Sequence, residues 1–413
     1  MASILFVTWD GGGNVAPALG IAAELRDRGE RVRFLGHEQQ GPAIEGAGFR
    51  CEPYRHARPW SPAEAAYGHG AELTIFEVFT DPGIGEDLLA SIEREPADLV
   101  VADCLLLGAL AAADRAGLRR AVLVHTFYEY LASRWSRGPV RRFAQDRGQD
   151  PVRLWAAADL VLVATAPQLD PSAGVVPRAL PANACYTGPV VRVPDPPPGP
   201  PTGGIPRVLV SLSTIHYPGQ TGVLQAILDA LADIPVTGVV TTGPAVDPGQ
   251  LSAPGNCELH RYVPHNDVLP GVSLVIGHGG HATTMRALAW GRPLLIIPMH
   301  PMLDQPMIGK AVSEAGAAEI LPKTAPPARI REAAARLVAD GPHRAAARRL
   351  GDSIRAADGV ATAATRLQEL LSPRISSESA NSLTRDRDRC EDQAAASQPA
   401  ASEASRARRL WLG

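Results

Sequence analysis

The residues best suited to chemistry lie in the stretch GHGGHATTMRALAWGRPLLIIPMHPMLDQP, residues 277–306. His278 directly follows an apolar run that is typical of a buried strand. Gly279 and Gly280 allow the chain to turn sharply and let a ligand approach the backbone closely. An imidazole in such a turn can donate a hydrogen bond to an anionic oxygen.

The residues after this turn favour a phosphate as that anion. Ala282 and Thr283 open a predicted helix, and the free N–H groups and the dipole at a helix start attract phosphate. Asp304 and Gln305 follow the next predicted strand. A neighbouring carboxylate and amide offer acceptors and donors for the hydroxyls of a sugar. His278 alone could be structural, and the Asp304-Gln305 pair alone is common in loops, but the spacing between them favours a site for a phosphate with a sugar beside it.

A second unusual loop is WDGGGNVAP, residues 9–17, which follows the apolar run Ser3–Thr8. The chain leaves a predicted strand through three glycines, presents Asn14 and starts a helix near Pro17, a residue suited to a first helical turn. The loop could bind a nucleotide or expose a catalytic group. It lacks a GxGxxG motif, and the next strand is followed only by Glu38, which argues against a dinucleotide oxidoreductase.

The elements around these loops alternate between short apolar runs and helical patterns. Strands are predicted at 4–8, 31–36, 97–104, 120–126, 160–165, 207–214, 236–243, 257–263, 272–280 and 293–298. This βαβ rhythm predicts the α/β class, with two doubly wound parallel sheets that carry helices on both faces. Ligands in such folds lie beyond the carboxyl ends of the strands, and here also between the two halves.

Composition divides the chain into four parts. A proline-rich linker at 190–206 separates an N-terminal domain, 1–189, from a C-terminal domain, 207–371. The polar segment 372–413 has few large apolar residues, so we expect it to be disordered.

The whole-chain composition excludes several classes of protein. A formal net charge of −3 over 413 residues gives no basic surface for nucleic acid, and no apolar run is long enough to span a membrane. We also expect no signal peptide, because the apolar start has no basic residues before it. The cysteines form no CxxC pair, which predicts reduced thiols in the cytoplasm and no zinc site; they are Cys51, Cys104, Cys185, Cys257 and Cys390.

The stretch 277–306 resembles the nucleotide-sugar box of the family 1 glycosyltransferases, which have the GT-B fold. The resemblance extends from residues 9–29 through RYVPHNDVLP, residues 261–270, to DQP, and is greatest to the actinobacterial enzymes that decorate antibiotics and other natural products. It implies two Rossmann-like domains with a cleft between them. It also implies an inverting, metal-independent transfer of a (deoxy)hexose from a nucleoside diphosphate, TDP or UDP, to a small hydrophobic acceptor. No cofactor beyond the nucleotide-sugar co-substrate is expected.

The resemblance also implies roles for individual residues. Histidine, glycines and threonine of the box would bind the diphosphate, the Asp-Gln pair the hexose, and the backbone near Val263 the nucleobase. The implied donor-binding set is Ser213, Thr214, Thr242, Gly243, Val263, His278, Gly279, Gly280, Ala282, Thr283, Asp304 and Gln305.

Two positions depart from the family pattern. Arg286 stands where the family usually has a glutamate that grips the ribose hydroxyls. An arginine cannot accept those hydrogen bonds, which is compatible with a thymidine donor. Asn14 stands where much of the family has its catalytic base, a histidine or an aspartate. An amide cannot take a proton from an acceptor hydroxyl.

Other residues of the first half could supply the base. We rank Asp10 first, because it lies on the same loop, then Asp103, then His125, which follows a strand end. Asp103 matches the carboxylate that orients the base in related enzymes, or it caps the helix that follows. His69 lies in another loop of this half. An acidic phenol or a carbon nucleophile would need less help from a base.

Three further questions stay open at this level. The aromatic residues Trp9, Phe127, Tyr128, Tyr130 and Trp135 could line an acceptor pocket or belong to the core. The departures at the base and ribose positions also fit a non-catalytic auxiliary subunit that activates a true transferase. A homodimer is among the assemblies that the sequence leaves open.

Overall fold

The fold is built on two parallel sheets. The first contains β1 (Ser3–Val7), β2 (Arg31–Gly36), β3 (Arg50–Pro53), β4 (Leu99–Asp103), β5 (Arg120–Val124), β6 (Leu160–Val163) and β7 (Ala184–Tyr186). The second contains β8 (Arg207–Ser211), β9 (Thr237–Thr241), β10 (Cys257–His260), β11 (Val272–Gly277), β12 (Leu294–Ile296) and β13 (Ala318–Ile320).

The computed structural model describes residues 1–62, 71–174, 180–194, 197, 199 and 203–372. Met1–Leu371 form one compact unit. Part of the predicted linker, the predicted disorder of the tail from 373 onward and the candidate His69 lie outside the described residues.

The strand orders confirm the predicted doubly wound α/β architecture. The first sheet runs β3-β2-β1-β4-β5-β6-β7 and the second runs β10-β9-β8-β11-β12-β13, with every pairing parallel. The order reverses between β1 and β4 and again between β8 and β11. Loops that leave these strands on opposite sides of the sheet open a crevice at their carboxyl ends. The glycine loop follows β1, and His278 follows β11.

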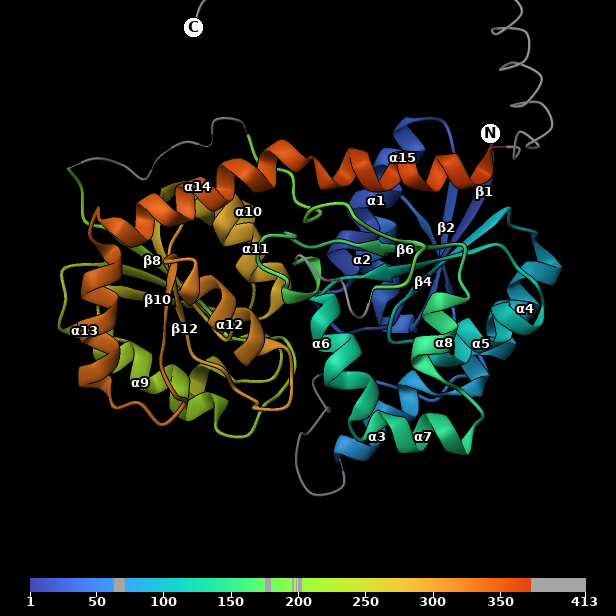
Figure 1. The fold of residues 1–413 in the computed structure, drawn as a ribbon. Coiled ribbons are helices and arrows are strands. Elements are labelled where there is room, and N and C mark those ends of the chain that lie inside the picture. Colours follow the sequence, from blue (N-terminus) through green and yellow to red (C-terminus); the bar gives the residue numbers. More distant parts are fainter. Residues whose placement is uncertain (63–70, 175–179, 195–196, 198, 200–202, 373–413) are drawn as a thin grey trace, which may run out of the picture. The chain divides into compact units, whose positions relative to one another are not determined.

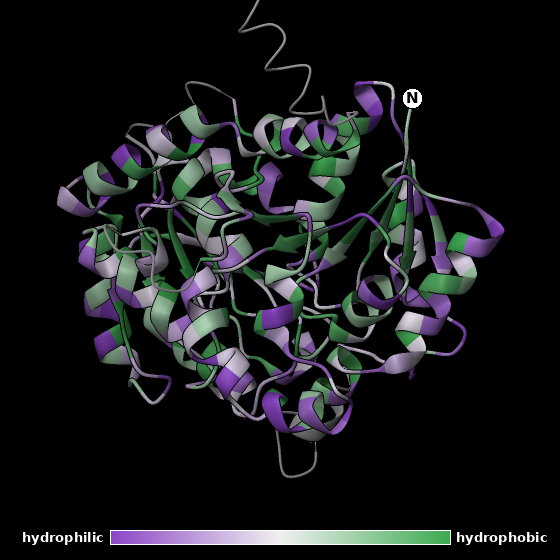
Figure 2. Ribbon diagram, turned by 45° about the vertical axis from the view of Figure 1, so that its right-hand side comes forward, coloured by the Kyte–Doolittle hydropathy of each residue, from purple (hydrophilic) through white to green (hydrophobic). Residues whose placement is uncertain are grey.

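Helices cover both faces of the sheets. They are α1 (Val15–Asp27), α2 (Gly41–Gly46), α3 (Ala71–Phe79), α4 (Pro82–Arg94), α5 (Leu107–Arg115), α6 (Tyr128–Ser133), α7 (Val140–Asp146), α8 (Pro151–Ala156), α9 (Gln220–Ala232), α10 (His265–Val268), α11 (His281–Ala289), α12 (Gln305–Glu314), α13 (Pro327–Val338), α14 (Pro342–Ala357) and α15 (Gly359–Leu371). Figure 2 shows the inner strands mostly as hydrophobic ribbons, while the helices carry hydrophilic residues among hydrophobic ones. The central strands β1 and β4 are buried along their whole length, as expected for parallel strands covered on both faces.

Three strands escaped the sequence analysis: β3, β7 and β13. Each lies at a sheet edge and has only three or four residues. Edge strands are partly exposed, so they lack the continuous apolar run by which the central strands are recognised.

The C-terminal helix α15 packs against the first half of the chain. Asp358 has a φ of 40° and breaks the path between α14 and α15, and α15 then lies beside α1 (Figure 1). Ala363, Ala364 and Leu367 are fully buried in the hydrophobic cluster under the first sheet. Sequence patterns alone grouped this helix with residues 207–371, because an amphipathic helix does not show which sheet its apolar face will cover.

Among the described residues, no helix is both long enough and apolar enough to cross a membrane.

Candidate active site

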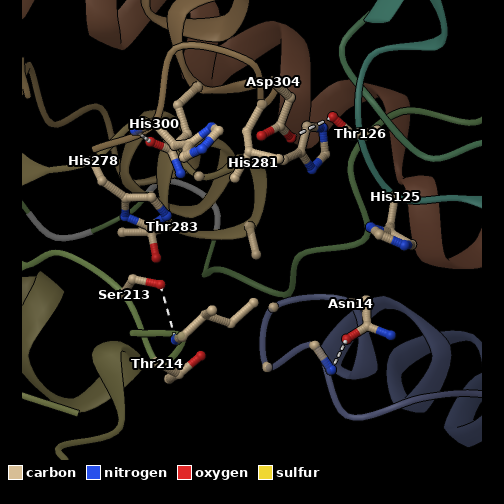
Figure 3. A pocket seen from close by; sticks show the side chains of 18 of the residues that line it. Asn14, His125, Thr126, Ser213, Thr214, His278, His281, Thr283, His300 and Asp304 are labelled. Atoms are coloured by element: carbon tan, nitrogen blue, oxygen red, sulfur yellow. Dashed lines mark hydrogen bonds between the residues drawn. The ribbon is translucent and has the colours of Figure 1, made fainter. Parts of the chain in front are cut away.

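A cavity of about 430 Å³ lies at the carboxyl ends of the two sheets and is lined by residues of both halves. In Figure 3, Asn14, His125 and Thr126 come from the first half, and His278, Thr283, Ser213 and Thr214 face them from the second. A volume of this size suits a small organic ligand.

The glycine loop brings the two halves into close contact. Gly12 has a φ of 73°, and a Cβ at this position would overlap the Oγ1 of Thr214. A Cβ at Gly13 would lie 3.3 Å from the Cβ of Ala282 at the start of α11. The loop therefore needs glycine for its left-handed backbone and for its approach to the second half.

Asn14 connects this loop to Asp103. Its Nδ2 donates to the backbone oxygen of Trp9 at 3.0 Å and to Oδ2 of Asp103 at 2.8 Å, and its Oδ1 accepts from the N–H of Gly11 at 3.1 Å. Both polar atoms of the buried amide are thus engaged. The role of Asn14 in this geometry is to hold Asp103 and the glycine loop together.

Asp103 and His125 form a hydrogen-bonded pair at the ends of the neighbouring strands β4 and β5. Nε2 of His125 lies 3.2 Å from Oδ1 and 3.1 Å from Oδ2 of Asp103. Burial lowers the pKa of His125, but Asp103 and Cys104 raise it more, so its pKa stands well above the usual 6.5. Burial raises the pKa of Asp103, but His125 and hydrogen bonds from Leu105 and Asn14 bring it below the usual 3.8.

The candidate bases differ in their access to the cavity. His125 and Asn14 line it, whereas Asp103 lies behind them and Asp10 is not among the lining residues. Burial raises the pKa of Asp10. Asp10, which ranks first from the sequence, is therefore not part of the cavity wall, whereas His125, which ranks third, is part of it.

Asp103, Cys104 and His125 are of metal-binding types, and one ligand atom from each lies within 4.8 Å of the others. The set does not fit a metal well. The carboxylate already accepts hydrogen bonds from Asn14, Leu105 and His125. Burial raises the pKa of Cys104, which favours the thiol over the thiolate that binds metals. We assign this group to hydrogen bonding.

His278 lies on the opposite wall of the cavity. Burial lowers its pKa to about 4, so the imidazole is neutral at pH 7, and its Nδ1 has no hydrogen-bond partner among the described residues. A Cβ at Gly280 would overlap the imidazole ring, and a Cβ at Gly279 would lie 2.9 Å from Ile296. Gly280 therefore lets the ring fold over the start of α11, and Gly279 lets the turn pack against Ile296 and the backbone of Gln305.

Most of the predicted donor-binding residues line the cavity. The exceptions are Thr242, in whose place Thr241 lines it, and Gly279, which packs behind the wall. The ten that line it are Ser213, Thr214, Gly243, Val263, His278, Gly280, Ala282, Thr283, Asp304 and Gln305.

Asp304 contacts the first half directly. Its Oδ2 accepts a hydrogen bond of 2.6 Å from Oγ1 of Thr126, and burial raises its pKa. The Oε1 of Gln305 accepts from the N–H groups of Met299 and His300, at 2.7 and 3.1 Å. The side-chain oxygen of Gln305 therefore stabilises the loop between β12 and α12.

A second contact between the halves joins His281 to Thr165. Nε2 of His281 lies 2.7 Å from Oγ1 of Thr165, and both side chains are buried. Burial lowers the pKa of His281 to about 3. His281 is thus a buried part of the cavity wall.

A cation stands at the end of the cavity near Val263. Arg286 lines it together with Tyr262 and His265, and among the described residues no carboxylate pairs with this guanidinium. Burial lowers the pKa of Arg286 and brings that of His265 to about 4.

Aromatic side chains of the first half form an apolar part of the cavity lining. Trp9 packs edge-on against Phe79 at 4.8 Å between ring centroids, and Phe79 contacts Trp135 at 5.8 Å. Trp9, Tyr130 and Trp135 line the cavity, as one of the two sequence interpretations proposed. Of that group, Phe127 and Tyr128 are instead buried in the core.

Sequence reasoning missed several lining residues: Ile75, Phe76, Phe79, Thr126, Arg134 and Tyr217. Thr126 could have been found, since it follows His125 at a strand end. The aromatic residues of α3 carry no such signal, because an apolar helix face looks the same whether it lines a cavity or the core.

Known proteins resemble this chain over much of its length. Residues 225–370 match the family model described as Erythromycin biosynthesis protein CIII-like, C-terminal domain. The 4'-demethylrebeccamycin synthase of Lentzea aerocolonigenes is 28% identical over 90% of this chain and 100% of its own length. The demethyllactenocin mycarosyltransferase of Streptomyces fradiae is 33% identical over 42% of this chain and 37% of its own. Among solved structures, the glycotransferase of kitacinnamycin has a TM-score of 0.72 and 25% identity, over 90% of this chain and 99% of its own.

Proposed function

Since the chain belongs to the family 1 glycosyltransferases with the GT-B fold, in the actinobacterial branch that acts on natural products, we propose the reaction that it catalyses. It transfers a hexose or deoxyhexose from a nucleoside diphosphate, with thymidine or uridine as the nucleoside, to a small hydrophobic acceptor in antibiotic biosynthesis. The observation that carries the proposal is one cavity that is lined by His278, Thr283 and Asp304 from the second half and by Trp9 and Trp135 from the first.

The second half supplies the groups for the donor. The start of α11 presents backbone N–H groups and the Thr283 hydroxyl to a diphosphate, and His278 adds a neutral N–H donor. These donors would stabilise the negative charge that develops on the leaving diphosphate. Asp304, at the start of α12, would accept hydrogen bonds from the sugar hydroxyls.

The charge beside Val263 favours thymidine over uridine. A uridine donor has a ribose with two free hydroxyls, for which a carboxylate is the better acceptor. Arg286 offers only donors here, and no carboxylate among the described residues is paired with it. A deoxyribose has one hydroxyl fewer, so it loses fewer hydrogen bonds than a ribose when Arg286 replaces a carboxylate at this position.

The first half supplies an apolar wall for the acceptor. Trp9, Tyr130 and Trp135 contribute aromatic surface to the cavity, which suits a fused or aromatic aglycone. With donor and acceptor on opposite walls, the nucleophile reaches the anomeric carbon from the side opposite the diphosphate. A single displacement of this kind inverts the anomeric centre, and we assign no metal to it.

We also propose the cytoplasm as the compartment. Cys51, Cys104, Cys185 and Cys257 are free thiols, which persist in a reducing environment.

Calorimetric titration of TDP and UDP into the full chain and into His278→Ala tests the donor site. A hydrogen bond to a charged group contributes about 1.5–3 kcal/mol, so the variant should bind roughly tenfold or more weakly. His37→Ala is the matched control, because His37 is also buried with a pKa of about 4 and lies outside the cavity. The tighter nucleotide identifies the donor class. If neither nucleotide binds the wild type, the donor-site assignment is wrong and the auxiliary-subunit alternative gains support.

A further inference from the structure

The reaction needs a group that takes the acceptor's proton, and Asn14 cannot be that group. Its Oδ1 accepts from Gly11, while its Nδ2 donates to Trp9 and Asp103. Resting on the proposed function, we propose that His125 is the general base of the transfer and that Asp103 positions it. The histidine that the glycine loop lacks is supplied from the end of β5 instead.

The topology explains how a residue on another strand can take this place. In the first sheet β4 lies between β1 and β5, and all three strands end at the same edge. The loop after β1 reaches Asp103 through Asn14, and the end of β5 reaches the same carboxylate through His125. One carboxylate thus serves as the anchor for both neighbouring strand ends.

The position of His125 relative to the donor site is fixed by the next residue. Thr126 donates a hydrogen bond of 2.6 Å to Asp304, the residue expected to hold the sugar. Because Thr126 and Asp304 are hydrogen-bonded, the end of β5, which is followed by His125, is held close to the residue that is expected to bind the sugar. His125 lies on the cavity wall at this point, with Asn14 beside it (Figure 3).

Two other carboxylates fit the role less well. Asp103 is buried and fully engaged by its hydrogen bonds to Asn14, Leu105 and His125. Asp10 does not line the cavity. Among the first-half candidates from the sequence that the structure describes, His125 is the one that both lines the cavity and can accept a proton.

The step balances as a single displacement. The acceptor hydroxyl transfers its proton to a ring nitrogen of His125 while its oxygen forms a bond to the anomeric carbon. The bond from that carbon to the diphosphate oxygen breaks, and its electron pair leaves with the nucleoside diphosphate. The Asp103 carboxylate stabilises the imidazolium that results.

The charges around His125 predict the pH dependence. Asp103 and Cys104 face it from β4 and the turn after it, His281 from α11 and Asp304 from the start of α12. Asp103 holds the pKa of His125 well above 6.5, and a base must be neutral to act. The rate of transfer should therefore rise with pH up to values above the usual range of histidine. Asp103→Asn removes that carboxylate, so the rising limb should move to lower pH.

The test uses the full chain with TDP-glucose and a series of substituted phenols of graded acidity. His125→Gln should lower kcat for the least acidic phenols by about 10²–10⁴-fold, and the loss should shrink as the phenol becomes more acidic. Affinity for TDP should stay unchanged. His37→Gln, a buried histidine outside the cavity, should keep the wild-type rate.

Each outcome decides between the roles. A loss in His125→Gln that is the same for every phenol, or that appears with weakened TDP binding, would show a structural role. A rate that falls as pH rises would make His125 a cation that stabilises the diphosphate. Wild-type transfer retained in His125→Gln would overturn the assignment alone, whereas no transfer or TDP binding by the wild type would overturn the proposed function with it.

Discussion

Replacing Gly12 with alanine tests whether the glycine loop contacts Thr214 in the proposed donor site. Gly12 has a φ of 73°, and its new Cβ would overlap Oγ1 of Thr214 and lie 3.3 Å from Cβ of that threonine. Gly29 is the matched control, since its φ is 91° but nothing lies within 4 Å of a Cβ there. The pair separates backbone strain from contact with the second half.

The expected magnitudes differ between the two measurements. A left-handed backbone costs about 1–2 kcal/mol for a residue with a Cβ, so urea unfolding should show at least this loss of stability in both Gly12→Ala and Gly29→Ala, and a larger loss in Gly12→Ala. Only Gly12→Ala also forces Thr214 out of its rotamer, which costs about 0.5–1.5 kcal/mol. Calorimetric titration should therefore show TDP binding weakened by roughly two- to tenfold in Gly12→Ala alone.

A second substitution sharpens this test. Thr214→Ala removes the overlapping Oγ1, so Gly12→Ala should weaken TDP binding less in the Thr214→Ala background than in the wild type. Equal TDP affinity in Gly12→Ala and Gly29→Ala would refute the reasoning, because the loop would then lie away from the second half in the binding form.

Two further predictions concern stability. Leu367 of α15 is fully buried against the first half, so Leu367→Ala should lower the free energy of unfolding by about 2–5 kcal/mol. In urea unfolding, the control Glu369→Ala should have little effect, because Glu369 is exposed. Equal losses in the two variants would mean that α15 does not stay packed on α1. Burial holds the pKa of His37 at about 4, below its usual 6.5. The unfolded chain therefore binds this proton more readily, and stability falls as pH drops from about 6.5 to about 4, by up to about 1.4 kcal/mol per pH unit. Urea unfolding across this window should show a shallower slope for His37→Gln, and identical slopes would contradict the assignment.

The sequence determined the architecture and identified most of the second-half residues that were expected to bind the donor and that line the cavity. Parallel strands buried on both faces must be continuously apolar, so β1, β4, β8 and β11 were visible as runs, and His278 was visible because it directly follows one. The Gly279–Gly280 turn also had a local signature, since Gly279 has a φ of 86° and a Cβ at Gly280 would overlap the His278 ring. These features depend on neighbours in sequence.

Tertiary structure decided the identity of the candidate base. Asp103 and His125 are 22 residues apart, and their hydrogen bond exists because β4 and β5 pair in the sheet. Asp10 ranked first from sequence because it is near Asn14 along the chain, yet the path of the loop keeps it off the cavity wall. The same holds for α15 and for Phe79, whose apolar faces gave no sign of which surface they would cover. Local sequence patterns indicate which side chains of a segment are apolar and buried. The pairing of strands that are distant in sequence decides which side chains come into contact.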